Sequence, residues 1–325
     1  MEQFKKIYTF KNCNNELFAL GPENRNINFL SSITNVEIVA RHQDIFIPEK
    51  EDETKLVEIF SILESLACKQ IYLSLKDIKI IVNSLDNGTK NEIISFFEER
   101  EVFINTDSGK SIIPRSINQY KYLKSLDKND IVFSIGSAGS GKTFLAIMFA
   151  AKIFKMKKVR KIFLVRPIVE AGEKLGFLPG DMKEKIDPFL VPLYDALYEV
   201  FGKEETNKMI AKGTIEVTPL AYMRGRTLED SVVILDEAQN ATTLQMKMFL
   251  TRLGQNSKMI ITGDITQIDL PRKSNSGLIE AINILKNIKG IDVIEFNKND
   301  VMRHDLVSKI IERYERLESK ENSND

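Results

Sequence analysis

The sequence IGSAGSGKTF, residues 135–144, is the strongest indication of how this chain folds. It fits the pattern G-x-x-x-x-G-K-[S/T], begins where the apolar run DIVFSI ends, and leads into the helical pattern FLAIMFAAKIF. Small residues let backbone N–H groups turn inward around phosphate oxygens, and the start of a helix directs its positive end to the same place. We therefore predict a phosphate-binding loop that consists of Gly136, Ser137, Ala138, Gly139, Ser140, Gly141, Lys142 and Thr143.

Two residues of this loop carry the expected chemistry. Lys142 is expected to reach the β and γ oxygens of a nucleoside triphosphate, and Thr143 to offer its hydroxyl to Mg²⁺. The pattern therefore predicts ATP and Mg²⁺ as the bound groups.

A second segment, SVVILDEAQN at residues 231–240, is an apolar strand that ends in two carboxylates. The carboxyl ends of strands line the ligand crevice in a doubly wound sheet, so Asp236 is expected to hold Mg²⁺ and Glu237 to orient or deprotonate the attacking water. A small-molecule kinase would need a pocket for another nucleophile, and no arginine-rich lid follows the core. The pair therefore favours hydrolysis over phosphoryl transfer to a small molecule.

A third segment, MIITGDITQIDL at residues 259–270, is another apolar strand with polar residues at its end. A hydroxyl or an amide there, from Thr262 or Gln267, can sense the γ-phosphate. Upstream of the phosphate loop, Gln119 is a candidate to present its amide to an adenine edge.

The chain has two parts with different sequence patterns. Residues 1–107 are expected to form a small α/β domain, because NVEIVARHQDIFIPE reads as a strand pair and TKLVEIFSILESLAC as a helix. A linker is expected at 108–116, and a P-loop ATPase domain at 117–316, where continuously apolar strands alternate with helices as in a buried parallel sheet. Residues 317–325 are charged and polar, which predicts a disordered tail.

Composition gives few further constraints. The 325 residues have a formal net charge of zero, so any basic surface for a nucleic acid must be local. Cys13 and Cys68 lie far apart and are expected as reduced thiols, and neither His42 nor His304 has neighbours at metal-ligand spacing. We expect a cytoplasmic protein without a membrane partner, because Met1 is not followed by a signal-peptide core and no apolar run approaches a membrane span.

Together these segments resemble the PhoH family of bacterial P-loop ATPases, in particular its YbeZ-type subgroup. The resemblance covers roughly residues 110–316 and also rests on VRPIVEAGEKLGFLPGDMKEKIDPFLVPLYDAL, IEVTPLAYMRGRT, MKMFLTRLG and DVMRHDLV. It implies a RecA-like core similar to half of a superfamily-1 helicase, with ATP and Mg²⁺ bound. It further implies ring-shaped homo-oligomers, expected as hexamers, and association with a YbeY-type endoribonuclease in ribosomal RNA processing.

The resemblance also assigns expected roles to individual residues. Gln267 matches the helicase-like GDxxQ element, and Arg303 matches a position where an arginine contacts the γ-phosphate. Met302 and Asp305 replace a valine and a proline that are common in the family, which does not threaten catalysis. The first domain resembles the N-terminal domain of the same subgroup and not a PIN nuclease domain. It is either a KH-like RNA module, although it lacks GxxG, or a protein-docking surface.

A helicase of this class places nucleotide between two RecA-like lobes, and this chain has room for one. An arginine that stabilises the transition state must then come from another subunit or from the tail, which predicts an oligomer. The candidates are Arg303, Arg224 and Arg226. Loops with Arg166, Lys174, Arg224 and Arg226 could contact single-stranded RNA, with Phe177 or Tyr222 stacking on its bases.

Two functions remain open from the sequence. The first is an ATP-hydrolysing, helicase-like remodeller that acts in RNA processing. The second is a nucleotide-gated adaptor, which recruits a YbeY-type endoribonuclease without unwinding RNA.

Overall fold

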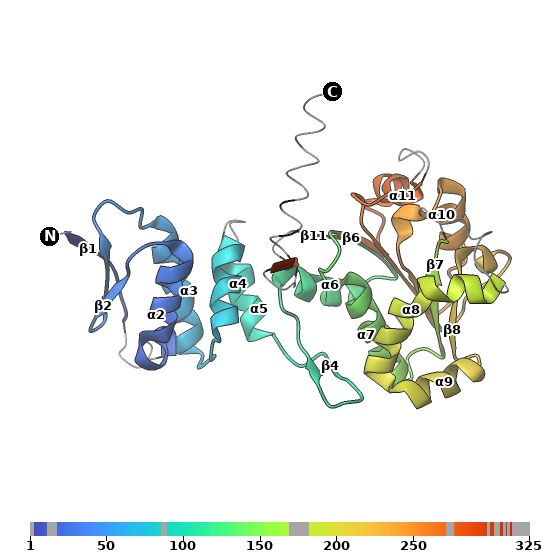
Figure 1. Ribbon diagram of the computed structural model, residues 1–325, viewed down its shortest axis with the longest axis horizontal. Coiled ribbons are helices and arrows are strands. Elements are labelled where there is room, and N and C mark those ends of the chain that lie inside the picture. Colours follow the sequence, from blue (N-terminus) through green and yellow to red (C-terminus); the bar gives the residue numbers. More distant parts are fainter. Residues whose placement is uncertain are drawn as a thin grey trace, which may run out of the picture. The chain divides into compact units, whose positions relative to one another are not determined.

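The computed structural model describes residues 3–11, 18–85, 90–168, 182–270 and 276–297, and the single positions 300, 301, 306, 307, 310 and 313. Residues 182–187 are described by their backbone alone. The chain divides into two compact units (Figure 1). The first unit comprises Met1–Glu101 and Ile113–Tyr120, and the second comprises Val102–Ile112 and Lys121–Asp325. Among the described residues, no helix is both long and apolar enough to cross a membrane.

The first unit is a three-stranded antiparallel sheet with helices. Its sheet has the order β1-β3-β2, from β1 (Phe4–Thr9), β2 (Val39–Arg41) and β3 (Asp44–Pro48), and the pairing of β2 with β3 confirms the predicted strand pair. Its helical elements are η1 (Pro22–Asn24), α2 (Arg25–Thr34), α3 (Thr54–Cys68), α4 (Leu75–Leu85) and α5 (Lys90–Glu98).

The core of the first unit explains why these residues form these elements. In β3, Ile45 and Ile47 are fully buried while Phe46 between them is only partly buried, the alternation of a sheet with one covered face. Helix α3 buries Ile59, Phe60 and Leu63 at helical spacing, as its sequence predicts.

The second unit is built on a six-stranded sheet in which all paired strands are parallel. The order is β11-β6-β10-β9-β7-β8, so β10 lies between β6 and β9. The strands are β6 (Ile131–Gly136), β7 (Lys161–Arg166), β8 (Ile215–Pro219), β9 (Ser231–Leu235), β10 (Lys258–Gly263) and β11 (Ile291–Phe296). This arrangement confirms the predicted α/β class with a RecA-like P-loop core.

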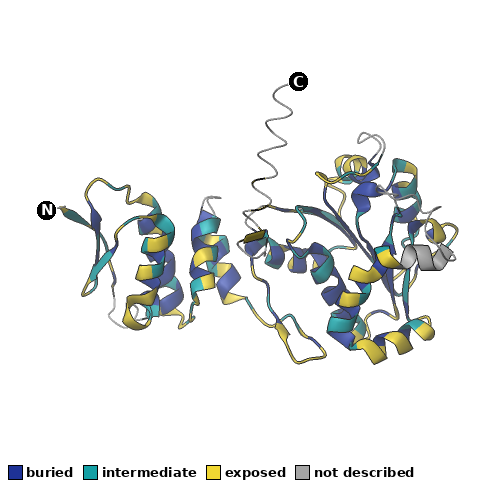
Figure 2. Ribbon diagram, viewed as in Figure 1, coloured by how far each residue is buried: buried dark blue, intermediate teal, exposed yellow. Residues whose placement is uncertain are grey.

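Helices and short 3₁₀ turns cover both faces of this sheet (Figures 1 and 2). They are α6 (Ile117–Lys128), whose first residues belong to the first unit, α7 (Lys142–Lys155), α8 (Met182–Phe201), α9 (Lys203–Ala211), η3 (Leu220–Met223), η4 (Ala238–Asn240), α10 (Thr243–Leu250) and α11 (Gly277–Leu285). Successive strand residues enter opposite cores: Val232 and Ile234 pack with α7 and α8, whereas Val233 and Leu235 pack with α10 and α11. Burial on both faces is why the strands are apolar throughout.

The expected linker at 108–116 is divided between the two units. Its first part belongs to a short hairpin in which β4 (Ile104–Asn105) pairs antiparallel with β5 (Ser111–Ile112). The hairpin is attached to α8, because Asp107 N–H donates to the Glu199 carbonyl over 3.1 Å and Lys110 Nζ lies 2.7 Å from Glu199 Oε1. The expected tail at 317–325 lies outside the described residues.

Candidate functional site

The predicted phosphate loop leaves the carboxyl end of β6 and enters α7 at Lys142. Gly136, Gly139 and Gly141 have φ angles of 137°, 85° and 87°, values that side chains disfavour. At Gly136 a Cβ atom would stand 2.3 Å from the backbone oxygen of Phe296 on β11. Glycine is therefore required here for the loop to leave the sheet, and the backbone N–H groups that follow can approach an anion closely.

The Lys142 side chain folds back over the loop. Its Nζ donates to the carbonyls of Gly136 (2.6 Å) and Ser137 (2.8 Å) and to Ser140 Oγ (3.3 Å). The side chain is 7% exposed, so its positive charge is held inside the concave loop beside the start of α7. A cation and a helix N-terminus at one place favour binding of a phosphate.

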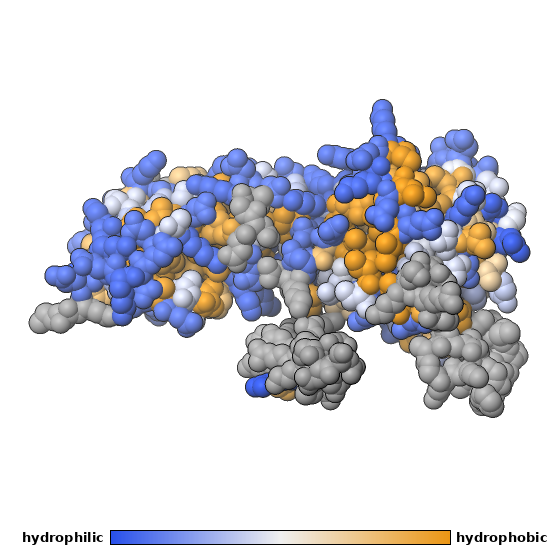
Figure 3. All heavy atoms as spheres, turned by 90° about the horizontal axis from the view of Figure 1, so that it is seen from above, coloured by the Kyte–Doolittle hydropathy of each residue, from blue (hydrophilic) through white to orange (hydrophobic). Residues whose placement is uncertain are grey.

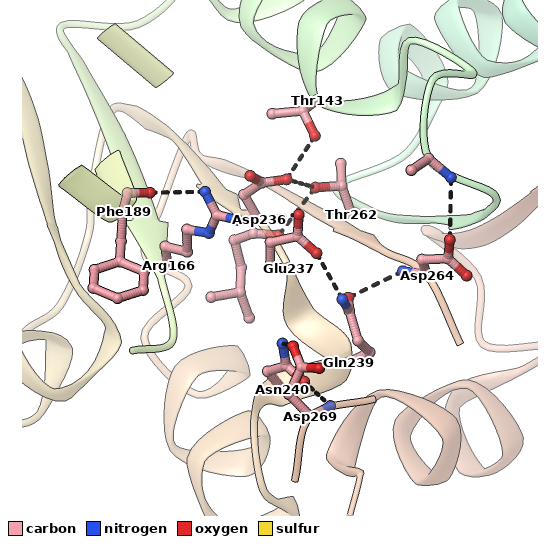
Figure 4. A network of polar contacts seen from close by, with 12 residues as sticks. Thr143, Arg166, Phe189, Asp236, Glu237, Gln239, Asn240, Thr262, Asp264 and Asp269 are labelled. Carbon is pink, nitrogen blue, oxygen red and sulfur yellow. Dashed lines mark hydrogen bonds and ion pairs between the residues drawn. The ribbon is translucent and has the colours of Figure 1, made fainter. Parts of the chain in front are cut away.

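Asp236 joins three strand ends at the carboxyl edge of the sheet (Figure 4). Its N–H donates to the Val165 carbonyl of β7 over 2.8 Å. Its Oδ1 accepts from Thr143 Oγ1 of the phosphate loop (2.6 Å) and from Thr262 Oγ1 of β10 (2.7 Å). The two residues predicted to hold Mg²⁺, Asp236 and Thr143, therefore lie in direct contact.

Glu237 follows Asp236 in a left-handed conformation, with φ 51° and ψ 40°. Both of its carboxylate oxygens are engaged: Oε1 accepts from Arg166 Nη2 over 3.1 Å and Oε2 from Gln239 Nε2 over 2.6 Å. Arg166 also donates from Nη1 to the Phe189 carbonyl of α8 over 2.7 Å. The carboxylate is thus fixed in orientation beside Asp236 by one cation and one amide.

The loop after β10 is cross-linked to the loops after β6 and β9. Asp264 Oδ2 accepts from the Ala138 N–H of the phosphate loop (3.1 Å), and the Asp264 N–H donates to Gln239 Oε1 (3.0 Å). Next to this contact, Asn240 and Asp269 exchange two hydrogen bonds of 3.0 and 2.9 Å. The three loops that meet at this edge therefore form one polar network.

A pocket of about 460 Å³ opens beside Glu237. Arg166 and Phe189 line it on the side of β7 and α8, and residues 266–269, including the exposed Gln267, contribute from the loop after β10. Gln267 therefore lies in the same pocket as Glu237, as a γ-phosphate sensor would require.

The residues present fit Mg²⁺ and a nucleotide. Asp236 Oδ1 and Thr143 Oγ1 are oxygen donors of the kind that Mg²⁺ prefers. Among the residues that the structure describes, no group of three or more His, Cys, Asp or Glu could hold a metal ion by itself. Mg²⁺ bound through few protein oxygens and the phosphates of a substrate matches this donor set.

Other described residues that the sequence singled out have different contacts or are exposed. Gln119 is 6% exposed on α6, in the part assigned to the first unit, and its Oε1 accepts from the Arg115 N–H over 2.8 Å. Arg226 pairs with Glu216 through two bonds of 2.5 and 2.9 Å and lies 5.0 Å from the Phe163 ring. Arg224 and Tyr222 are exposed after β8. Lys174, Phe177 and Arg303 lie outside the described residues.

Sequence reasoning missed Gln239 and the link between Arg166 and Glu237. Gln239 stands two positions after Glu237, a spacing that does not by itself indicate contact, and Arg166 is 71 positions away from Glu237. A polar residue at the end of an apolar strand was the available signal for Arg166, and it indicated a ligand contact rather than a partner within the chain.

Comparison with known proteins identifies similar chains over most of this sequence. A family model described as PhoH-like protein matches residues 111–315. The PhoH-like protein of Bacillus subtilis (strain 168) is 46% identical over 310 residues, which cover 94% of this chain and 96% of that protein. The PhoH-like protein of Mycobacterium tuberculosis (strain CDC 1551 / Oshkosh) is 54% identical over 231 residues, 71% of this chain and 65% of that protein.

Protein PhoH of Escherichia coli (strain K12) is 43% identical over 205 residues, 62% of this chain and 58% of that protein. Among solved structures, a Sulfolobus solfataricus SWI2/SNF2 ATPase core in complex with dsDNA matches with a TM-score of 0.31 and 14% identity. That match covers 57% of this chain and 45% of the other.

Proposed function

This chain belongs to the PhoH-like protein family, and we propose that it binds ATP with Mg²⁺ and hydrolyses it at the network around Asp236. The observation that carries the proposal is the direct contact of Thr143 with Asp236, at 2.6 Å, with Glu237 next in the chain. This contact joins the phosphate loop to the strand end that carries the two carboxylates. A phosphate-binding loop, two oxygen ligands for a metal ion and a base therefore lie close together, as hydrolysis of a phosphoanhydride requires.

Each residue then has one task. The N–H groups of the loop and Lys142 hold the phosphates, and Thr143 and Asp236 hold Mg²⁺. When bound, the metal ion neutralises charge on the phosphate oxygens. Glu237 accepts a proton from the water whose oxygen forms the new bond to the γ-phosphorus, as the bond to the ADP oxygen breaks. Arg166 and Gln239 orient Glu237, and Gln267 senses the γ-phosphate.

The proposed target is single-stranded RNA, and the proposed setting is RNA processing in the cytoplasm. Exposed Tyr222 and Arg224 support an RNA contact, because they follow β8 at the carboxyl edge of the sheet and combine a stacking ring with a cation. Arg226 is a weaker candidate for this contact, since Glu216 neutralises it.

An oligomer is proposed for two reasons. The second unit contains one RecA-like sheet, so an arginine that stabilises the transition state must come from elsewhere. Of the two candidates that the structure describes, Arg226 forms an ion pair with Glu216, which leaves Arg224. Apolar side chains are also exposed on and after α11, at Ile279 (39%), Ile284 (67%) and Ile288 (47%). Figure 3 shows apolar surface gathered over the second unit, as expected for a face that another subunit covers. A ring of six subunits stays a prediction.

The test is steady-state ATP hydrolysis by the purified protein, with and without single-stranded RNA, beside the Glu237→Gln variant. We expect RNA to raise turnover about tenfold, and Glu237→Gln to lower turnover about 10²- to 10⁴-fold while ATP binding is retained. Full turnover in Glu237→Gln would refute its role as the base. Full turnover by a dilute monomer would refute an ATP site that needs an arginine from another subunit.

The second candidate is an adaptor that changes its assembly with bound ATP and recruits a YbeY-type endoribonuclease. The ion pair of Arg226 with Glu216 favours it, because it removes one cation from the surface available to RNA. Slow turnover that RNA leaves unchanged would support the adaptor over the remodeller.

A further inference from the structure

We propose that Gln239 is a positioning residue that couples occupancy of the phosphate loop to the orientation of Glu237. The proposal deepens the proposed function, since it concerns how the same site is regulated, and it rests on that function. Its basis is a continuous chain of hydrogen bonds in which the Gln239 carboxamide is the central member (Figure 4).

The chain begins at the phosphate loop and ends at the proposed base. Ala138 N–H donates to Asp264 Oδ2 over 3.1 Å, and the Asp264 N–H donates to Gln239 Oε1 over 3.0 Å. Gln239 Nε2 then donates to Glu237 Oε2 over 2.6 Å. Three hydrogen bonds therefore separate a phosphate-binding N–H group from the carboxylate.

A glutamine amide is the side chain that this position requires. It accepts from a backbone N–H with its oxygen and donates to a carboxylate with its nitrogen, two tasks that a carboxylate or an apolar group cannot combine. Gln239 is 1% exposed, so loss of either bond would leave a buried polar group unpaired. Gly263 makes room for it, because a Cβ atom there would stand 2.9 Å from Gln239 Oε1.

The direction of the coupling follows from charge. A phosphate oxygen bound in the loop competes with Asp264 for the Ala138 N–H, and the two anions repel each other. Nucleotide binding therefore displaces the Asp264 carboxylate from the loop. Its backbone N–H is bonded to Gln239, so the displacement shifts the carboxamide and with it the Glu237 carboxylate.

Arg166 sets the other limit of this movement. It holds the second Glu237 oxygen at 3.1 Å and is itself attached to the Phe189 carbonyl of α8. A shift of Gln239 therefore moves one of the two donors that hold the Glu237 carboxylate, while Arg166 stays in place. Without nucleotide, Arg166 and Gln239 hold Glu237 in one orientation; with nucleotide, the shifted Gln239 carboxamide turns the Glu237 carboxylate about its contact with Arg166.

The test compares the isosteric variant Gln239→Glu with Asn240→Ala in the full chain. The Asn240 side chain links the same two loops through Asp269. Asn240 meets Glu237 only through its backbone N–H, which the substitution to alanine keeps, so the variant controls for loss of a cross-link. In Gln239→Glu we expect kcat for ATP to fall about tenfold to a hundredfold, since misplacing a catalytic group by an ångström costs about that much. The Kd of Mg·ATP should change less than about threefold, and Asn240→Ala should lower kcat much less than Gln239→Glu does.

Amide hydrogen exchange with a non-hydrolysable ATP analogue and Mg²⁺ gives a readout without turnover. In the wild type, the analogue should change exchange at residues 264–269 and also at 237–241. In Gln239→Glu the first change should remain and the second should be lost. Wild-type kcat in Gln239→Glu, or an undiminished change at 237–241, would overturn the coupling. If the wild type binds the analogue but hydrolyses no ATP, the proposed hydrolysis fails, and the exchange result still decides the coupling.

Discussion

The two ends of the parallel sheet in the second unit carry different kinds of polar contact. At the carboxyl ends of β6, β9 and β10, side chains from separate loops bind one another, as Thr143, Asp236 and Thr262 do. At the amino ends, Lys258 has backbone partners instead: its Nζ donates to the carbonyls of Asp127 (3.2 Å) and Asn129 (2.6 Å). The larger hollow, of about 760 Å³, is at the amino ends, whereas the pocket beside Glu237 measures about 460 Å³.

This difference shows that pocket size does not locate the site. Around the hollow at the amino ends lie three acidic and two basic residues: Asp127, Asp130, Glu229, Lys158 and Lys258. These charges of both signs do not favour a ligand of one charge. At the carboxyl ends, the start of α7, Lys142 and the loop N–H groups all favour an anion at one place. Convergent groups therefore favour the carboxyl ends as the place where the sheet binds an anion.

The Lys142→Ala variant should have the largest effect at the carboxyl ends. Loss of the only cation bonded to the loop carbonyls of Gly136 and Ser137 in the described structure should lower ATP turnover about 10²- to 10³-fold, as for loss of one strong transition-state donor. Nucleotide affinity, measured by a fluorescent ATP analogue, should also weaken. Unchanged turnover would mean that the carboxyl ends are not the reacting site.

Glycine substitutions at the two ends test the role of the backbone. Gly136 at the carboxyl end of β6 and Gly290 before β11 both have positive φ, but only Gly136 would place a Cβ atom against backbone. We expect Gly290→Ala to lower the free energy of unfolding by about 1–2 kcal/mol through the left-handed conformation. In Gly136→Ala, overlap of the new Cβ atom with the Phe296 backbone should lower the free energy of unfolding by about 1–3 kcal/mol more. Urea unfolding measures both, and equal losses would contradict the close approach to Phe296.

The two arginines that flank β7 give a smaller, more specific test. Arg166 at its carboxyl end holds Glu237, and Arg160 before its amino end lies 3.6 Å from Asp230 with its side chain 85% exposed. Arg166→Ala should lower kcat about tenfold through loss of orientation of Glu237, well within the range for a misplaced group. Arg160→Ala should leave kcat unchanged. The outcome that argues against a role for Arg166 is a similar kcat in both variants.

The smallest expected effect concerns Lys258 at the amino end. Burial lowers the pKa of its ammonium from the usual value of 10.5, so the folded state disfavours the charged form. This penalty to stability is fully present below the folded pKa and disappears as pH rises towards the unfolded value near 10.5. The Lys258→Met variant lacks the penalty. Its stability relative to wild type should therefore fall as pH rises through this range, in urea unfolding at pH 7 to 10.5, while ATP turnover at pH 7 is unchanged. A relative stability that rises with pH would contradict the lowered pKa.

Prediction from sequence succeeded where neighbouring residues carry the information. The pattern at 136–143 and the apolar strands that end at Leu235 and at Gly263 predicted the parallel sheet, because burial on both faces leaves a continuous apolar run. The linker was less predictable. The polar stretch at 108–116 contains β5, whose partner β4 and whose attachment to Glu199 of α8 depend on residues elsewhere.

The family, the class of fold and the identity of the loop could be predicted from the sequence, since each depends on local residue types and their spacing. Which polar groups meet depends on how the chain packs. Arg166 comes to Glu237 because β7 and β9 are adjacent in the sheet, and Asp264 comes to Ala138 because β10 lies beside β6. Strand order is set by packing of the whole chain, so contacts between loops cannot be read from spacing along the sequence.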